Sequence, residues 1–363
     1  MVSNLSIQAE LQKIRKEKLA SCYLILGTEK FLQDQVRTEI VKKIQLEGED
    51  DLNFLSFDME NASLDEVVAE AETLPFFGDQ RLVFVENPYF LTGEKVNNGI
   101  EQNTDLLTAY LKEPLESTVL VFFAPYEKLD ERKKVTKQLK KTAIIINVQQ
   151  LNEKEVRQYL MNTLENSSIK MERSAIDLFL RLTDLDLSKM MRELQKLVLY
   201  GQNQQQITVR EVEELVPKTL EHNIFDMTQY ILKGKTEQAL RLYEDLVMQG
   251  EETIKINAIL LSQLRLFLQT KFLVKIGYQQ ANIAETLKIH PYRVKLAMQE
   301  VKKFDEHLLV QLFDQLVEMD YQIKTGQIEK ELLMVRIIYL GMILLICINE
   351  LREQQMPREM LIT

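Results

Sequence analysis

The chain has 363 residues, of which 45% are hydrophobic and 28% charged, as in a globular protein. This length is too great for one ordinary core and fits two or three domains of about 100 to 200 residues each. Glycine (11), proline (7) and tryptophan (0) are scarce, which disfavours sandwiches and barrels and favours long helices. The net charge of −10 excludes nonspecific binding of nucleic acid over the whole surface, so any DNA contact is expected to be local or assisted by partners.

The cysteines and the apolar segments indicate the cellular compartment in which the protein is expected. Cys22 and Cys347 lie far apart in apolar segments, which is typical of buried thiols and not of a disulfide framework. Residues 1–20 are polar with helical spacing, unlike a secretory leader. The longest apolar run, residues 337–348, is shorter than the roughly 20 residues of a membrane span, so we interpret it as a buried C-terminal helix, with a membrane anchor as the alternative. We expect a cytoplasmic protein that does not bind membranes.

Short β-rich segments alternate with helical segments over residues 5–148. Several of these segments are nearly unbroken apolar runs, as in strands that helices cover on both faces. The predicted strands are residues 22–26, 54–57, 82–85, 118–123 and 143–148. Helical crossovers between five strands predict an α/β domain with a mostly parallel sheet over residues 1–150.

Strand patterns stop after residue 150, and helical spacing takes over. Helices are predicted from residue 152, over residues 172–182 and 187–200, with Gly201 as a C-cap, and over residues 207–214. They fit a compact helical domain over residues 151–215. Further helices are predicted at residues 223–232, 236–248, 252–276, 283–287, 291–304, 308–325 and 330–350. These form a third, all-helical domain over residues 216–350, followed by a tail, residues 351–363, of open role.

The first strand and the glycine turn after it invite comparison with a phosphate loop. A working loop has the pattern G-x-x-x-x-G-K-[ST], in which the second glycine lets backbone amides approach phosphate and the lysine and hydroxyl hold phosphate and magnesium. Here the pattern begins at Gly27, but Leu32 takes the place of the second glycine, and Gln33 and Asp34 take the place of the lysine and the hydroxyl residue. The strand over residues 82–85 also lacks the Asp-Glu pair of a hydrolytic site. We therefore expect no nucleotide cofactor.

The histidines and cysteines, which often act in catalysis or bind metals, do not cluster in the sequence. His222, His290 and His307 are isolated from one another and from either cysteine, so no metal site is expected. No G-x-S-x-G elbow and no local Cys/His pattern occurs. We expect no catalytic site in this chain alone.

Residues 283–294 have the pattern of two short helices around a turn. In a helix-turn-helix protein the second helix enters the major groove of DNA. Such helix pairs are also common in any helical bundle, and that interpretation is favoured here. Lys295, Lys302 and Lys303 could touch phosphates, although a solvated helix face is the simpler explanation for them.

Two adjacent phenylalanines lie between a predicted helix and the strand over residues 82–85. Leu74, Pro75, Phe76 and Phe77 are followed by Gly78. Periodicity alone favours a core position for the aromatic pair, because phenylalanine is usually buried. The proline and the glycine nevertheless place the pair at a corner between two elements, where it could bind a partner.

With these segments taken together, the chain resembles the delta subunit of the clamp loader of bacterial DNA polymerase III. The resemblance extends to about residue 335, and no single motif decides it, but the order and spacing of the motifs do. The matching pieces are Tyr23-Leu24-Ile25, Gly27, Glu29, Phe31-Leu32, residues 74–78, residues 81–83, residues 193–197, Tyr200, Glu221, residues 223–226, Gly234, Ala239-Leu240, residues 263–265 and residues 324–326.

The resemblance implies an AAA+-like protein that does not use nucleotide. Residues 1–150 would be a RecA-like domain that binds the sliding clamp, residues 151–215 a three-helix lid, and residues 216–350 a collar. The collar would assemble with the ATPase and delta-prime-like subunits. Residues 341–363 match nothing in the family's pattern.

The implied function is to bind and open the sliding clamp so that it is loaded on primed DNA. The clamp contact would be made by Leu74, Pro75, Phe76 and Phe77, with Glu72 where the family's pattern often has glutamine. The chain would then be a subunit of a DNA-directed DNA polymerase holoenzyme, a nucleotidyltransferase. Two other interpretations are a helix-turn-helix DNA-binding protein and an inactive ATPase-like scaffold of some other complex.

Overall fold

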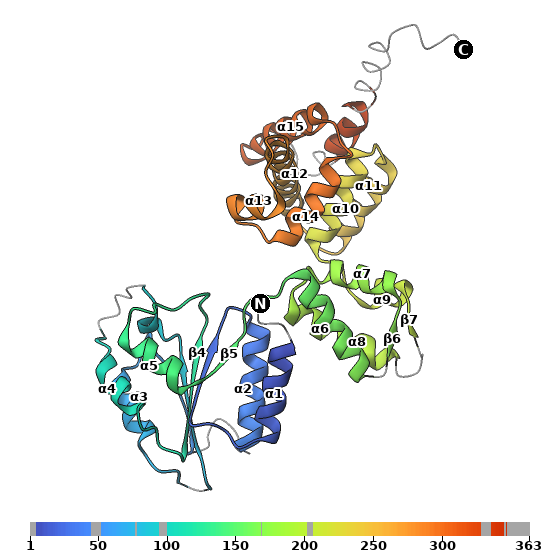
Figure 1. Cartoon of the computed structure of the whole chain (residues 1–363). Helices are drawn as coiled ribbons and strands as arrows, with labels where there is room; N and C mark the ends of the chain where they lie inside the picture. The colour runs from blue at the N-terminus through green and yellow to red at the C-terminus, as the bar shows by residue number, and fades with distance from the viewer. Residues whose placement is uncertain are drawn as a thin grey trace. The chain divides into compact units, whose positions relative to one another are not determined.

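The computed structural model describes residues 5–44, 52–76, 78–93, 100–167, 169–201, 206–327, 335–344 and 346 (Figure 1). Contacts divide the chain into two compact units. The first comprises residues 1–168 and 187–192, and the second comprises residues 169–186 and 193–363.

The first unit is built on a five-stranded sheet in which every neighbouring pair is parallel. The strands are β1 (Cys22–Leu26), β2 (Phe54–Asp58), β3 (Arg81–Glu86), β4 (Thr118–Ala124) and β5 (Ile144–Asn147), in the order β2-β3-β4-β1-β5. β1 and β4 are buried along their whole length, as their unbroken apolar sequences predict. All five predicted strands are confirmed to within one or two residues at each end.

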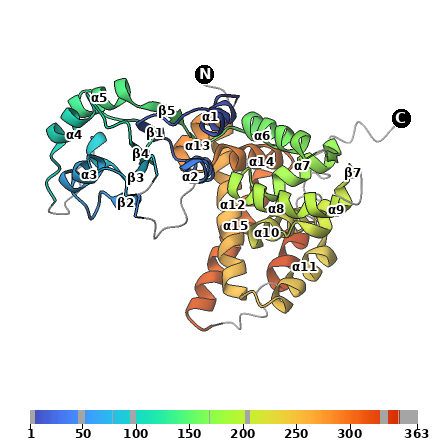
Figure 2. The same cartoon turned by 90° about the horizontal axis from the view of Figure 1, so that it is seen from below.

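Helices cover both faces of this sheet. They are α1 (Leu5–Lys16), α2 (Lys30–Ile44), α3 (Leu64–Ala71), α4 (Thr104–Tyr110) and α5 (Lys134–Thr142), with a 3-10 turn, η1 (Tyr89–Leu91). The next helix, α6 (Glu153–Asn166), contacts α2, where the Tyr159 hydroxyl donates to the Gln35 side chain at 2.9 Å. Figures 1 and 2 show α1 and α2 on one side of the sheet and α3, α4 and α5 on the other. The core beneath α3, α4 and α5 includes Leu24, Val83 and Phe122, which are side chains of the central strands.

A small α/β element opens the second unit. It contains α7 (Arg173–Leu182), α8 (Leu187–Gly201), whose first residues belong to the first unit, and α9 (Val209–Leu215). Two strands, β6 (Lys170–Met171) and β7 (Gln206–Ile207), pair in parallel. The expectation that strands stop after residue 150 is therefore wrong, because two-residue strands are too short to produce a recognisable alternation. Gly201 was expected as a C-cap but is the last residue of α8, where an added Cβ would lie 3.4 Å from the Ile169 side chain.

The rest of the second unit is helical in the part that the structure describes. The helices are α10 (Leu220–Leu232), α11 (Thr236–Met248), α12 (Thr253–Lys275), α13 (Gln280–Leu287), α14 (Pro291–Val301) and α15 (Glu306–Lys324). Figures 1 and 2 both place α12 beside α14 and α15, and its buried residues lie on several sides of the helix. A further helical stretch, residues 335–344, packs on α10 so closely that a Cβ added to Gly341 would lie 2.5 Å from Ile231.

Two expectations about the compartment can be compared with the structure. Cys22 is buried, and burial raises the pKa of its thiol above the ordinary value. Cys347 lies outside the described residues. Among the helices that the structure describes, none combines the length and the apolar character that a membrane span requires.

Candidate partner-binding site

The α3 helix is fixed at its beginning by its own sequence. The Ser63 hydroxyl accepts the Glu66 backbone N–H at 3.3 Å, and the Glu66 carboxylate accepts the Ser63 N–H at 2.7 Å, which forms a capping box. Hydrogen bonds from the Ser63 backbone and hydroxyl hold the pKa of Glu66 below its usual value. Leu64, Val67 and Val68 are buried in the core under the helix. These contacts fix the beginning of α3 and the face that it packs on the core.

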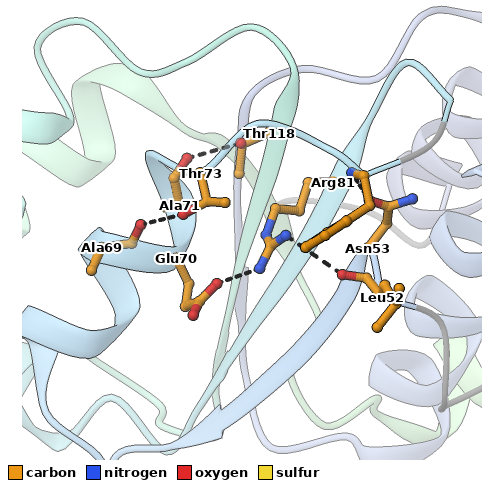
Figure 3. A network of polar contacts seen from close by, with 9 residues as sticks. Leu52, Asn53, Ala69, Glu70, Ala71, Thr73, Arg81 and Thr118 are labelled. Carbon is orange, nitrogen blue, oxygen red and sulfur yellow. Dashed lines mark hydrogen bonds and ion pairs between the residues drawn. The ribbon is translucent and has the colours of Figure 1, made fainter.

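Polar groups from neighbouring elements also hold the end of α3 (Figure 3). The Ala71 carbonyl accepts hydrogen bonds from the Thr118 hydroxyl at 2.8 Å and from the Tyr110 hydroxyl at 3.4 Å. Burial raises the pKa of Tyr110 to about 12, so this side chain remains a neutral donor. The Thr73 hydroxyl donates to the Ala69 carbonyl at 2.9 Å. The last helical carbonyls therefore have partners although the helix stops.

The loop that follows, residues 72–80, connects α3 to β3. The Phe76 backbone N–H donates to Asn53 Oδ1 at 2.7 Å, and the Asn53 side chain is buried just before β2. Arg81, the first residue of β3, forms an ion pair with Glu70 of α3. Its other terminal nitrogen donates to the Leu52 carbonyl at 3.5 Å, and Figure 3 shows Arg81 between Glu70 and Leu52.

Large apolar side chains of this loop face solvent. Leu74 is 67% exposed and Phe76 is 63% exposed, whereas Pro75 is half-buried and Glu72 is exposed. The core position that periodicity alone favours is therefore wrong for Phe76. Phe77 lies outside the described residues. The loop thus presents exposed apolar side chains on a backbone that polar contacts hold, and this is the composition of a protein-binding site.

The turn after β1 has the opposite character. The Gly27 N–H donates to the Ala124 carbonyl at 3.1 Å, and the Gln33 side-chain amide donates to the Gly27 carbonyl at 2.6 Å. Gly27 has a φ of 141°, and a Cβ there would lie 2.3 Å from the Val148 carbonyl carbon. Leu32, at the position of a phosphate loop's second glycine, is buried. The chain's own groups therefore occupy the polar positions of this turn.

The carboxylate at the end of β3 is also engaged. Glu86 forms an ion pair with Arg37 of α2 at 2.5 Å. The Arg37 guanidinium lies 4.8 Å and 4.2 Å from the ring centroids of Phe84 and Phe123, in cation–π geometry. In the described part of the chain, no group of three or more His, Cys, Asp or Glu side chains could hold a metal ion.

The helix-turn-helix pattern forms two packed helices, α13 and α14. Ile283 and Ala284 of α13 and Val294 of α14 form a small apolar cluster between them. Lys288 adopts the left-handed conformation that ends α13, with a φ of 53°. Lys303 forms an ion pair with Glu300 at 2.7 Å. These contacts belong to the helical bundle, which is the interpretation that the sequence favoured.

The sequence analysis did not predict the polar side chains that hold the loop of residues 72–80. Asn53, Glu70 and Arg81 are as important to the geometry of the loop as its apolar residues, but only Arg81 belongs to a matching motif. One clue was present in the sequence: Arg81 interrupts the apolar strand at its first position, and a buried arginine requires partners.

Comparisons with known proteins identify the family of this chain. The family described as DNA polymerase III, delta subunit, matches residues 23–149, and its C-terminal domain matches residues 221–340. The DNA polymerase III subunit delta of Bacillus subtilis is 40% identical over 323 residues, which cover 89% of this chain and 93% of that protein. A probable delta subunit from Aquifex aeolicus is 25% identical over 146 residues, 39% of this chain and 42% of that protein.

A solved structure gives the same result. The structure of the Bacillus subtilis DNA clamp loader delta protein matches with a TM-score of 0.75 and 39% identity, over 93% of this chain and 99% of that one. This match confirms the expected fold class, an α/β domain with a parallel sheet followed by a mainly helical C-terminal part. The chain therefore belongs to the DNA polymerase III delta subunit family, whose members are components of the clamp loader in DNA replication.

Proposed function

We propose that this chain binds the sliding clamp through the loop of residues 72–80 and helps to open the clamp for loading on primed DNA. The observation that carries the proposal is the exposure of Leu74 and Phe76 on a loop whose backbone is hydrogen-bonded to buried Asn53. An aromatic side chain that enters a partner's apolar pocket typically contributes about 2 to 4 kcal/mol to binding. Phe77 is included in the contact on the ground of sequence alone.

The chain acts in this proposal by binding and not by catalysis. The turn after β1 leaves Leu32, Gln33 and Asp34 where phosphate and magnesium ligands would be required. Nucleotide hydrolysis is assigned to partner ATPase subunits, and nucleotide transfer to the polymerase of the same holoenzyme. Contact with primed DNA occurs within the assembled complex, in the cytoplasm.

The proposed domains are the clamp-binding domain over residues 1–150, the lid over residues 151–215 and the collar over residues 216–350. The collar has an apolar face that remains exposed in the chain by itself. The helical stretch of residues 335–344 buries Ile337 and Ile338 but exposes Val335, Tyr339 and Ile343, which are four residues apart and so share one side of the helix. This second face is suited to packing against neighbouring subunits.

Clamp binding can be tested without nucleotide. We expect the full chain to bind immobilised sliding clamp in buffer that lacks ATP, and we expect added ATP and magnesium to leave the affinity unchanged. The control is a Phe272→Ala variant, which removes an equally exposed phenylalanine from α12 and should bind as well as the wild type. An absence of binding by the folded wild-type chain would contradict the proposal.

Assembly through the collar requires a different test. We expect a Tyr339→Asp variant to lose co-elution with the partner ATPase and delta-prime-like subunits, because a charge at a buried interface is costly when unpaired. Clamp binding by the same variant should be unchanged. Normal assembly of the folded variant would show that this face is not the one that the collar uses.

A further inference from the structure

We propose that Asn53, Glu70 and Arg81 are positioning residues, which hold the loop of residues 72–80 in its clamp-binding conformation. The inference rests on the proposed function and adds to it the residues that fix the geometry of the contact. Asn53 is 6% exposed and Arg81 is 3% exposed, so neither side chain is available to a partner.

Asn53 fixes the middle of the loop. It lies one residue before β2, and its own carbonyl accepts the Leu82 N–H of β3 at 2.8 Å, so its backbone is part of the sheet edge. Its side-chain oxygen accepts the Phe76 N–H at 2.7 Å. A hydrogen bond at the backbone of Phe76 restricts the direction in which its ring leaves the protein.

Arg81 joins the two ends of the loop. Glu70 lies in the last turn of α3, just before the loop, and Arg81 is the first residue after it, so their ion pair connects the entry of the loop to its exit. The same guanidinium reaches the carbonyl of Leu52, the residue before Asn53. One side chain therefore ties together both ends of the loop and the segment that holds its middle (Figure 3).

Stability alone explains this pair poorly. The Arg81 guanidinium is buried, and its Nε has no hydrogen-bond partner in the described part of the chain, whereas the Glu70 side chain is 40% exposed. Desolvation of a buried charge offsets most of the attraction in such a pair, and replacing both members by apolar side chains is often neutral. When Arg81 alone is replaced, the Glu70 carboxylate can still be solvated, because its side chain is 40% exposed. The pair instead restricts the conformations of the loop. A loop that is already fixed loses less conformational entropy when it binds a partner, so its affinity is higher.

The test compares Arg81→Met, Glu70→Gln and Asn53→Leu in the full chain, with sliding-clamp affinity and melting temperature measured for each. We expect Arg81→Met and Asn53→Leu to stay folded with melting temperatures near that of the wild type, and Glu70→Gln to melt lower, because it leaves the buried Arg81 guanidinium without its carboxylate partner. At a temperature where each variant is folded, we expect it to bind the clamp about tenfold more weakly. Asn53→Asp keeps the acceptor oxygen and should recover most of the affinity lost in Asn53→Leu. Arg15→Met, which removes an ion pair with Glu39 between α1 and α2, is the matched control and should bind normally.

The same substitutions in a variant that already lacks the loop's apolar side chains show whether these residues act through the loop. In a chain that already carries Leu74→Ala and Phe76→Ala, adding Asn53→Leu should weaken binding by less than about twofold, because residues that act through one contact are not additive. Folded Arg81→Met and Asn53→Leu variants that bind like the wild type, while the Leu74→Ala, Phe76→Ala variant loses binding, would overturn the inference and leave the proposed function intact. If Asn53→Leu does not fold, Arg81→Met and Glu70→Gln decide the question in the same way. Normal binding by the Leu74→Ala, Phe76→Ala variant would overturn the proposed function itself.

Discussion

Two turns at opposite edges of the same sheet have opposite designs. The turn after β1 lies at the edge where the strands have their carboxyl ends. The backbone groups of Gly27 are hydrogen-bonded within the chain, and the nearby Leu32 side chain is buried. The loop before β3, at the amino edge, also bonds its backbone internally but leaves Leu74 and Phe76 in solvent. The carboxyl edge of a parallel sheet is where α/β proteins usually bind ligands. In the turn after β1 the chain's own groups occupy this edge, whereas the exposed apolar side chains of the loop lie at the other edge.

A binding site in such a turn requires both an ordered backbone and exposed apolar side chains. Both turns are held by specific hydrogen bonds, so order alone does not identify a binding site. What distinguishes the loop is that its ordered backbone carries apolar side chains that nothing in its own unit covers in the described part of the chain.

The largest effect should come from Gly27. A Cβ at this position would meet the Val148 carbonyl carbon and oxygen at 2.3 Å, and its φ of 141° disfavours any side chain. We expect Gly27→Ala to destabilise the protein by at least about 4 kcal/mol, measured by denaturant unfolding. Gly78→Ala is the matched control, since its φ of 75° is strained but no atom lies within 4 Å, so we expect a cost of about 1 kcal/mol. Equal losses of unfolding free energy in Gly27→Ala and Gly78→Ala would contradict the difference in packing between the turn after β1 and the loop before β3.

A matched pair of leucines gives the next largest effect. Leu32→Ala should cost about 3 kcal/mol of unfolding free energy, because the side chain is 1% exposed and its removal leaves a cavity. Leu74→Ala should change stability by less than about 0.5 kcal/mol, since the side chain is already in water. A large loss of stability in Leu74→Ala would mean that the loop is part of the core.

The smallest expected effect is that of nucleotide. Because Leu32, Gln33 and Asp34 replace the phosphate-loop residues, titration with a fluorescent ATP analogue and magnesium should give no saturable signal in the micromolar range. A control titration of a partner ATPase subunit should saturate under the same conditions. Saturable micromolar binding by this chain would contradict our interpretation of the turn after β1.

Local patterns in the sequence predicted most of the fold. Several strands of the large sheet are nearly unbroken apolar runs, and helices such as α6 begin at a cap residue, here Asn152, so these elements were recognisable. β6 and β7 were missed because each has two residues. The exposure of Phe76 followed from Pro75, Gly78 and the family resemblance, since periodicity favoured the core.

The support of the loop could not be predicted, because it depends on contacts between residues far apart in the sequence. Asn53 and Phe76 are 23 positions apart, and Glu70 and Arg81 are 11 apart on different elements. No local spacing rule connects an asparagine before one strand with a backbone amide in the loop before the next. Only the register of β2 against β3 brings them together.

Clamp binding through this loop can be tested with the Phe76→Ala, Phe77→Ala double variant. Sliding-clamp affinity and melting temperature should be measured on the same preparation. We expect affinity to fall by at least about a hundredfold, since each aromatic contact contributes about 2 to 4 kcal/mol and each 1.4 kcal/mol is a factor of ten. We expect the melting temperature to stay close to that of the wild type. A folded double variant that binds the clamp as tightly as the wild type would contradict the account.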